Sequence, residues 1–285
     1  MQALYWLEQS DSDVPLGDGW LSASERARLD ELRIPKRRAD WRLGRWTAKC
    51  AASGYLNLPR DWEALAGLEL RPAPSGAPEV FLDGRPAPVA LSLSHSRGTG
   101  LCAIAPAAVE VGCDLEMVEP RSPAFLADYF TDDERKLVAR TPAARRDRVV
   151  TLLWSAKESA LKALGCGLRS DTRSVNAAPA GFLETPGERW RRLSVATDGR
   201  TFGGWWREAR DLVRTVVADP PPPRLVALHL DARRLATGVS GDRGGMRPSN
   251  RTCAWAGGKS AAGTQDSANS ASGGLPRVGW DGASG

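Results

Sequence analysis

A short alternating segment followed by a helical pattern constrains the fold of this chain more than any other feature. Residues 111–116 read Val-Gly-Cys-Asp-Leu-Glu, and because successive side chains of a strand point to opposite faces, Asp114 and Glu116 share one face. In residues 148–164 the apolar side chains recur near the helical period of about 3.6 residues. These positions are Val149, Leu152, Leu153, Ala156, Ala160 and Leu164.

The predicted helix carries charges that complement those of the strand. Glu158 and Lys162 stand one helical turn apart and are expected on one exposed flank, with Lys157 next to it. Magnesium prefers oxygen ligands and completes its coordination with waters and phosphate oxygens. Three carboxylates and two lysines therefore suit a magnesium ion that holds a diphosphate. The alternative is that both groups are ordinary solvent-facing charges of a strand and a helix.

Two motifs carry a family resemblance. Gly-Cys-Asp-Leu-Glu at residues 112–116 and Trp-Ser-Ala-Lys-Glu-Ser-Ala-Leu-Lys at residues 154–162 resemble the paired signature of the 4'-phosphopantetheinyl transferases, specifically the long, surfactin-synthetase-activating (Sfp) type. Every fixed position of that signature is matched. Upstream, the basic residues 36–45 resemble the N-terminal helix of the family, and Leu-Ser-Leu-Ser-His-Ser at residues 91–96 resembles its Ser-His segment. The resemblance covers about residues 1–232.

The resemblance implies an α+β fold. The family is built from a pseudo-twofold pair of similar α/β subdomains with the active site in the cleft between them, which predicts an N-terminal subdomain at residues 1–108 and a C-terminal subdomain at residues 109–232. No residue-level repeat is visible in the sequence. From about Ala236 the composition turns to Gly, Ser, Ala and Arg without an apolar period. Residues 233–285 are therefore expected to be a disordered tail.

The resemblance also implies roles for individual residues. The magnesium ion is expected on the three carboxylates, and coenzyme A is expected to lie along basic residues from both subdomains. The predicted metal ligands are Asp114, Glu116 and Glu158. The predicted coenzyme contacts are Arg37, Arg45, Arg85, His95, Lys157 and Lys162. The predicted catalytic residues are Glu158, Lys157 and Asp114.

The activity implied by the resemblance is the transfer of 4'-phosphopantetheine from coenzyme A to a serine of an apo acyl, peptidyl or aryl carrier protein, with release of adenosine 3',5'-bisphosphate. The resemblance leaves open whether Glu158 accepts the serine proton directly or through a water. The long form leans toward secondary metabolism, including polyketide and nonribosomal peptide carriers, and a monomer is expected. The two alternatives are a coenzyme-A-binding pseudoenzyme without transferase activity and a basic nucleic-acid-binding protein.

Charge and composition narrow these alternatives. The 39 Lys and Arg against 34 Asp and Glu give a formal net charge of +5, which favours anionic partners without choosing among them. No nucleic-acid-binding motif accompanies the charge. Gly-Gly-Lys-Ser at residues 257–260 imitates a P-loop, but Cys253 stands where the motif requires its first glycine. Nucleic acid is therefore not an expected partner.

The remaining signals concern location and local structure. The five cysteines form no zinc spacing, and neither a signal peptide nor a membrane span is recognisable, so a reduced, cytoplasmic protein is expected. Thr131 and Glu134 form a capping box that predicts a helix to about residue 139. Strands are expected at 89–93 and 101–105, which places His95 at a strand end, and at 190–197, 201–207, 212–218 and 225–230.

Overall fold

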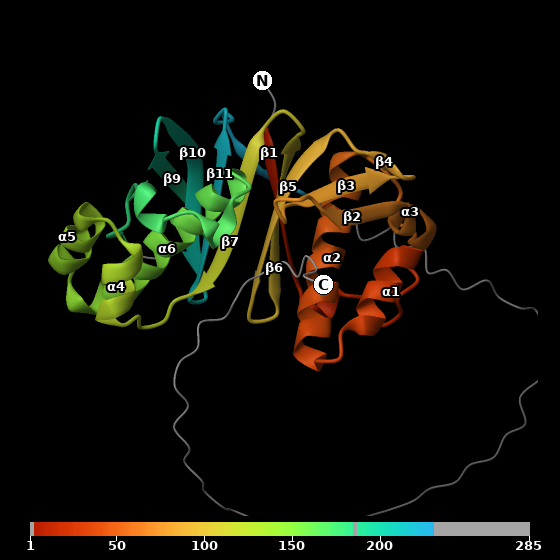
Figure 1. Cartoon of the computed structure of the whole chain (residues 1–285), viewed down its shortest axis with the longest axis horizontal. Coiled ribbons are helices and arrows are strands. Elements are labelled where there is room, and N and C mark those ends of the chain that lie inside the picture. Colours follow the sequence, from red (N-terminus) through yellow and green to blue (C-terminus); the bar gives the residue numbers. More distant parts are fainter. Residues whose placement is uncertain (1–2, 185–186, 231–285) are drawn as a thin grey trace, which may run out of the picture. The chain divides into compact units, whose positions relative to one another are not determined.

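The computed structural model describes residues 3–184 and 187–230 (Figure 1). Helices and strands are mixed along the chain, which confirms the predicted α+β class. The segment predicted to be a disordered tail, residues 233–285, lies outside the described residues. No helix in the described part is both long and apolar enough to span a membrane.

The first sheet combines strands from the two ends of the described chain. Its order is β12-β1-β6-β5, and β1 pairs in parallel with β12 and antiparallel with β6. A separate three-stranded sheet has the order β2-β3-β4, and its β3 contacts β5. The bounds in the first sheet are β1 Leu4–Ser10, β5 Val89–Ser96, β6 Thr99–Pro106 and β12 Leu225–Ala227. Those of the small sheet are β2 Leu68–Pro72, β3 Pro78–Leu82 and β4 Arg85–Pro86.

The second sheet carries the acidic strand at its edge. Its order is β7-β11-β10-β9-β8, and every neighbouring pair is antiparallel. The strands expected at 190–197, 201–207 and 212–218 are all present. The one expected at 225–230 also exists, but as β12 it belongs to the first sheet, a placement that the sequence did not predict. The bounds are β7 Glu110–Met117, β8 Asn176–Pro179, β9 Gly187–Thr197, β10 Arg200–Ala209 and β11 Leu212–Asp219.

One long helix covers each large sheet (Figure 1). Helix α2 packs on β1, β5 and β6, and helix α6 packs on β7 and β11. The six apolar residues predicted on the inner face of α6 lie in or against the core of the second sheet, as the helical period required. The pseudo-twofold relation between the halves remains a prediction. The α-helices are α1 Ala23–Glu31, α2 Pro35–Tyr55, α3 Trp62–Gly67, α4 Pro123–Tyr129, α5 Asp132–Arg140 and α6 Arg146–Ala163.

An ionic cluster joins the two large sheets. Glu8 of β1 accepts two hydrogen bonds from the Arg214 guanidinium of β11 and a third from Arg207 of β10. The Arg207 guanidinium also lies 4.4 Å from the ring centroid of Trp6 and 5.0 Å from that of Trp190. A planar guanidinium engages a carboxylate through paired donors and stacks on aromatic rings, so this cluster fixes β1 against β10 and β11.

Candidate active site

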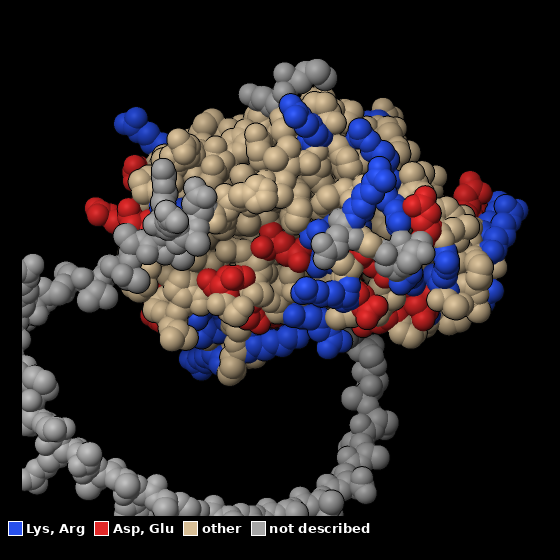
Figure 2. Space-filling model, turned by 180° about the vertical axis from the view of Figure 1, so that it is seen from behind, with Lys and Arg blue, Asp and Glu red and all other residues tan. Residues whose placement is uncertain are grey.

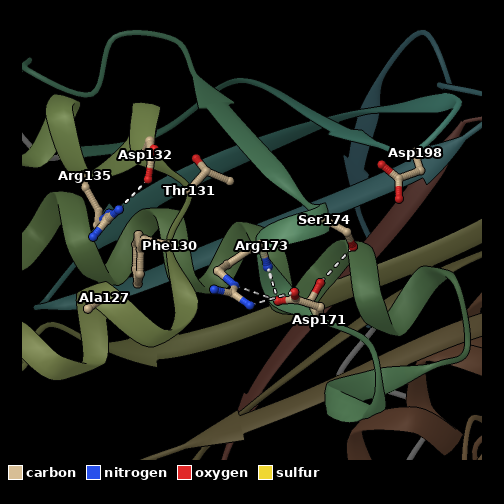
Figure 3. Close-up of a pocket in the computed structure, with 9 residues that line it drawn as sticks. All are labelled: Ala127, Phe130, Thr131, Asp132, Arg135, Asp171, Arg173, Ser174 and Asp198. Carbon is tan, nitrogen blue, oxygen red and sulfur yellow. Dashed lines mark hydrogen bonds and ion pairs between the residues drawn. The ribbon is translucent and has the colours of Figure 1, made fainter.

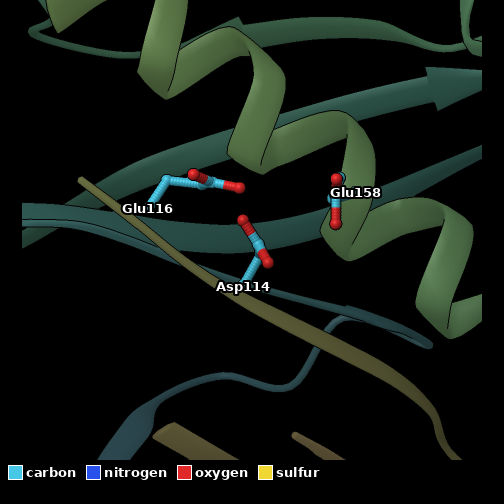
Figure 4. Close-up of side chains that lie close together, drawn as sticks. All are labelled: Asp114, Glu116 and Glu158. Atoms are coloured by element: carbon cyan, nitrogen blue, oxygen red, sulfur yellow. The ribbon is translucent and has the colours of Figure 1, made fainter. Parts of the chain in front are cut away.

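Three carboxylates converge where β7 meets α6. Asp114 and Glu116 extend from the strand, Glu158 extends from the helix, and one oxygen of each lies within 4.8 Å of the others (Figure 4). The side chains of Asp114 and Glu158 are buried, and that of Glu116 is half-buried. Within residues 3–184 and 187–230, this is the one group of three or more His, Cys, Asp or Glu side chains whose ligand atoms come together.

Two features of the backbone and side chains bring α6 close enough to β7. A Cβ atom built on Gly112 would lie 1.8 Å from the backbone oxygen of Ser159, so only glycine allows this approach. Thr215 of β11, the cross-strand partner of Asp114, shares hydrogen bonds with the hydroxyls of Ser155 and Ser159, at 2.8 and 2.7 Å. These contacts hold the helix in register with the carboxylates of the strand.

Asp114 has one satisfied oxygen and one free oxygen. Its Oδ1 accepts hydrogen bonds from the Ser94 hydroxyl at 2.9 Å and from the Lys162 ammonium at 2.7 Å. Its Oδ2 is buried and has no hydrogen-bond partner in the part of the chain that the structure describes. Buried polar oxygens are normally paired, so an unpaired one among three carboxylates fits a cation ligand.

The charges of the cluster do not balance. Arg121 lies 3.5 Å from Glu116, and Lys162 lies 3.9 Å from Glu158, so two cations face three carboxylates. Burial, Asp114 and Glu158 together raise the pKa of Glu116 to about 8. Burial and Asp114 raise the pKa of Glu158 to about 7. A divalent cation would supply the missing positive charge, and the all-oxygen donor set fits Mg²⁺.

These pKa shifts predict how stability responds to pH and magnesium. Because both folded-state pKa values lie above the ordinary 4.5, the stability linked to these carboxyls is complete below about pH 4.5 and is lost as pH rises through 7 and 8. Mg²⁺ binds the ionised forms, so the rise in Tm that it causes should grow between pH 5 and pH 8. Thermal shift with and without MgCl₂ measures this, with Asp114→Asn as the matched control. A rise in Tm that is the same at every pH, or the same in the variant, would contradict it.

Lys157 corrects a prediction. The sequence placed Glu158 and Lys162 on one exposed flank, with Lys157 next to it, but Lys157 is fully buried and Glu158 is 6% exposed, because α6 is covered on several sides. The Lys157 ammonium pairs with Glu134 at 2.7 Å, and the charges acting on Glu158 come from other residues. The structure therefore brings Lys162 to the carboxylates and does not bring Lys157 there.

Three of the predicted coenzyme contacts, His95, Arg37 and Arg85, differ in their exposure. His95 is the penultimate residue of β5, and burial lowers its pKa, a shift that Asp40 opposes and Lys162 and Lys36 reinforce. Arg37 at the start of α2 and Arg85 on β4 are exposed and accessible to an anionic ligand.

Arg45 differs from its prediction. Its side chain is buried, its Nε lies 3.7 Å from a Glu25 oxygen, and its guanidinium lies over the Trp41 ring. Arg45 lies past the exposed first turns of α2, on the part of the helix that packs against α1 and the sheet. In this structure its charge serves a buried ion pair and is not presented to a ligand.

Two residues of the site were not predicted. Ser94 lies within the Ser-His segment, and the alternation of β5 places it on the same face as Ser92, whose hydroxyl accepts the Cys113 amide. Two serines that alternate with leucines in a strand lie on one face, and this pattern indicates that a polar group packs against that face. Arg121 gave no such signal, because it lies in the irregular segment after β7.

A pocket elsewhere in the described residues has no convergent chemistry. It has a volume of about 530 Å³, and its lining comes from α4, α5, the turn at residues 171–174 and Asp198 (Figure 3). None of the three carboxylates lines it. Arg135 pairs with Asp132, and Arg173 pairs with Asp171, so these four lining charges are paired with one another. This pocket is therefore not the candidate site.

Surface charge does not favour nucleic acid on the face that Figure 2 shows. Lys and Arg side chains gather there with Asp and Glu side chains beside them. Among the described residues, Arg200 pairs with both Glu110 and Asp219. A nucleic-acid surface is normally a uniform basic patch or stripe.

Comparison with known proteins identifies sequences similar to this chain. The family model described as the 4'-phosphopantetheinyl transferase superfamily matches residues 110–217, which include β7, α6 and all three carboxylates. The chain is 28% identical over 198 residues to "4'-phosphopantetheinyl transferase HetI" of Nostoc, covering 67% of this chain and 80% of that protein. It is 27% identical over 220 residues to "Putative 4'-phosphopantetheinyl transferase slr0495" of Synechocystis, covering 72% and 85%.

Proposed function

We propose that this chain, which belongs to the 4'-phosphopantetheinyl transferase superfamily, transfers 4'-phosphopantetheine from coenzyme A to a serine of an apo carrier protein in a Mg²⁺-dependent reaction. The observation that supports this most is the converged carboxylate site, in which Oδ1 of Asp114 accepts the Lys162 ammonium and Oδ2 has no partner among the described residues. We also propose that the chain is of the long, surfactin-synthetase-activating type. Its substrates would then include carriers of secondary metabolism, such as polyketide and nonribosomal peptide carriers.

The residues of the site divide the chemistry among them. Asp114, Glu116 and Glu158 would hold Mg²⁺, which when bound neutralises charge on the diphosphate. Lys162 adds a fixed positive charge, and Ser94 and Lys162 together orient Asp114 by bonding the same oxygen. Such preorganised charge is the main contribution that a protein makes to phosphoryl transfer.

The transfer itself exchanges one oxygen for another at phosphorus. The carrier serine oxygen forms a bond to the β-phosphorus of coenzyme A, the bond from that phosphorus to the bridging oxygen breaks, and adenosine 3',5'-bisphosphate leaves with that oxygen. Glu158 accepts the serine proton, directly or through a water.

One assay tests the proposal against its alternatives. The protein is incubated with coenzyme A, MgCl₂ and several apo carrier domains, and mass spectrometry follows the addition of phosphopantetheine to the serine. Transfer to at least one acyl, peptidyl or aryl carrier is expected. Tight coenzyme binding without transfer to any carrier would instead identify a coenzyme-A-binding pseudoenzyme. Binding to nucleic acid alone, lost steeply with salt, would contradict both.

Arg85 supplies a test of the coenzyme contact. Replacement of Arg85 by Ala should raise KM for coenzyme A by about tenfold with little change in kcat, because a charge-assisted bond to phosphate is lost while the carboxylates are untouched. Steady-state kinetics measure both constants. Arg71→Ala is the matched control, since Arg71 is an exposed arginine of the same small sheet whose charge is paired with Glu69. Equal KM values in the two variants would remove Arg85 from the binding site.

A further inference from the structure

Lys157 is held by a complete set of buried acceptors. Its ammonium pairs with Glu134 at 2.7 Å and donates to the backbone oxygens of Thr172 at 2.8 Å and Val175 at 2.5 Å. An ammonium has three N–H donors, so each has an acceptor in this arrangement. Glu134 in turn accepts the amides of Thr131 and Ala177 through its two oxygens. These contacts tie α6 to the start of α5, to the 3₁₀ turn Thr172–Ser174 and to β8.

The same arrangement occurs in the N-terminal half. The Lys49 ammonium of α2 pairs with Glu25 at 2.5 Å and donates to the backbone oxygens of Trp20 at 3.0 Å and Leu65 at 2.9 Å. Glu25 accepts the amides of Ser22 and Leu70 through its two oxygens. We call each arrangement a helix clamp, defined by Lys49 and Glu25 in one half and by Lys157 and Glu134 in the other.

The two clamps correspond in position as well as in contacts. Each glutamate is the third residue of a helix that begins with a capping box. The glutamate and the strand amide that it accepts are 45 residues apart in the first half and 43 in the second. An aromatic ring lies beside each ammonium, Trp20 at 5.8 Å and Phe130 at 5.6 Å.

The second clamp shows that a lysine can make these contacts without a carboxylate cluster in its half of the chain. Lys49 is buried in a half that carries no converged carboxylates among the described residues, yet it makes the same contacts as Lys157. A buried lysine is costly unless its charge is paired and its donors are satisfied, and both clamps meet that requirement. The contacts of Lys157 are therefore those of a residue that anchors a helix.

In the C-terminal half the anchored helix also carries a ligand. Glu158 follows Lys157 directly, and neighbouring residues of an α-helix point about 100° apart around its axis. Holding Lys157 against Glu134 of α5 and the backbone oxygens of Thr172 and Val175 thus fixes the rotation of α6 that aims Glu158 at Asp114. We propose that Lys157 and Glu134 are positioning residues for the carboxylate cluster, a role that rests on the proposed function, in which that cluster binds a divalent cation.

The test compares matched double variants of the full chain. Lys157→Met with Glu134→Gln removes both charges of one clamp and leaves no stranded buried ion. Lys49→Met with Glu25→Gln removes both charges of the other clamp, and there Arg45 also loses its ion pair with Glu25. Mn²⁺ affinity is measured by the loss of the free-ion electron paramagnetic resonance signal, without coenzyme A. The first variant should bind Mn²⁺ at least about tenfold more weakly than wild type, as losses of supporting contacts around metal ligands do, and the second should bind normally.

Two outcomes separate this proposal from the proposed function. If the wild type binds Mn²⁺ and the Lys157/Glu134 double variant binds it with the same affinity, the positioning role alone is overturned. Wild-type protein that binds no Mn²⁺ would overturn the metal site and the positioning role with it. If Lys157 instead contacts the coenzyme phosphates, the double variant should show a raised KM for coenzyme A and an unchanged Mn²⁺ affinity. That result would also overturn the proposal.

A milder pair covers the case in which the double variant fails to fold. Glu134→Asp shortens the side chain by one methylene, so the carboxylate no longer reaches both the Lys157 ammonium and the Ala177 amide, while the charge balance is kept. It should weaken Mn²⁺ binding severalfold, and the matched Glu25→Asp should not. Equal Mn²⁺ affinities in the two aspartate variants would count against the proposal.

Discussion

Replacing Glu158 by Gln is expected to lower kcat for phosphopantetheine transfer by about a thousandfold, which is within the range for loss of a general base. The amide keeps the size of the side chain but removes an anionic ligand and the proton acceptor. Folding should be retained, because burial raises the pKa of Glu158 to about 7 and a neutral group avoids that cost. Mass spectrometry of the carrier domain measures transfer, and thermal melting without Mg²⁺ at pH 8 should give a Tm equal to or above that of wild type.

Glu119 provides the matched control for this substitution. Its carboxylate contacts Arg121 at 3.0 Å, as Glu116 does at 3.5 Å, but its side chain is 41% exposed and it lies outside the converged group. Glu119→Gln should therefore transfer at the wild-type rate. Normal transfer by the Glu158→Gln variant would remove Glu158 from both of its proposed roles.

The second large effect is expected from Gly112→Ala. The added methyl would lie 1.8 Å from the backbone oxygen of Ser159 and 2.8 Å from the backbone nitrogen of Ala163, so α6 must move away from β7. Overpacking against a fixed backbone typically costs about 1–3 kcal/mol, and this contact belongs at the upper end of that range. The displaced helix also carries Glu158 away from Asp114. Urea denaturation measures the free energy of unfolding, and the transfer assay measures the loss of activity.

Gly44→Ala separates this steric effect from the general effect of replacing a glycine. Gly44 lies within α2, and a Cβ built there meets nothing within 4 Å. Alanine at this helical position should raise the free energy of unfolding by about 0.5–1 kcal/mol. If the two alanine variants unfold at the same urea concentration, the close contact between α6 and β7 does not restrict residue 112.

The sequence predicted the secondary structure around the site because its local periodicities are strong. The alternation at residues 111–116 became β7, the apolar period at residues 148–164 became α6, and Thr131 with Glu134 formed the predicted capping box. Alternation also placed Asp114 and Glu116 on one face, the face that meets Glu158. These features depend on residues close together in the chain, which a sequence pattern describes well.

What the sequence did not predict depends on contacts between distant segments. A helical pattern shows that Lys157 and Glu158 lie on different sides of a helix, but not that α5 and β8 cover one of those sides. The buried Lys49 was hidden for the same reason, because its partner lies in another helix. The correspondence between the two helix clamps is also not recognisable in the sequence. Only a glutamate and a lysine recur at corresponding positions, and the residues around them differ.

The pairing of β1 with β12 has a consequence for how the protein is made. Leu4, Tyr5 and Trp6 lie opposite Leu225, Val226 and Ala227, so a strand synthesised near the beginning obtains one of its neighbours only after the whole second sheet has been translated. Until then β1 is an unpaired edge strand of the first sheet, and an unpaired edge is a site for incorrect pairing with other chains. Contacts between such distant residues also slow folding. The first half of the polypeptide is therefore synthesised first, but its sheet is complete only after β12 has been synthesised.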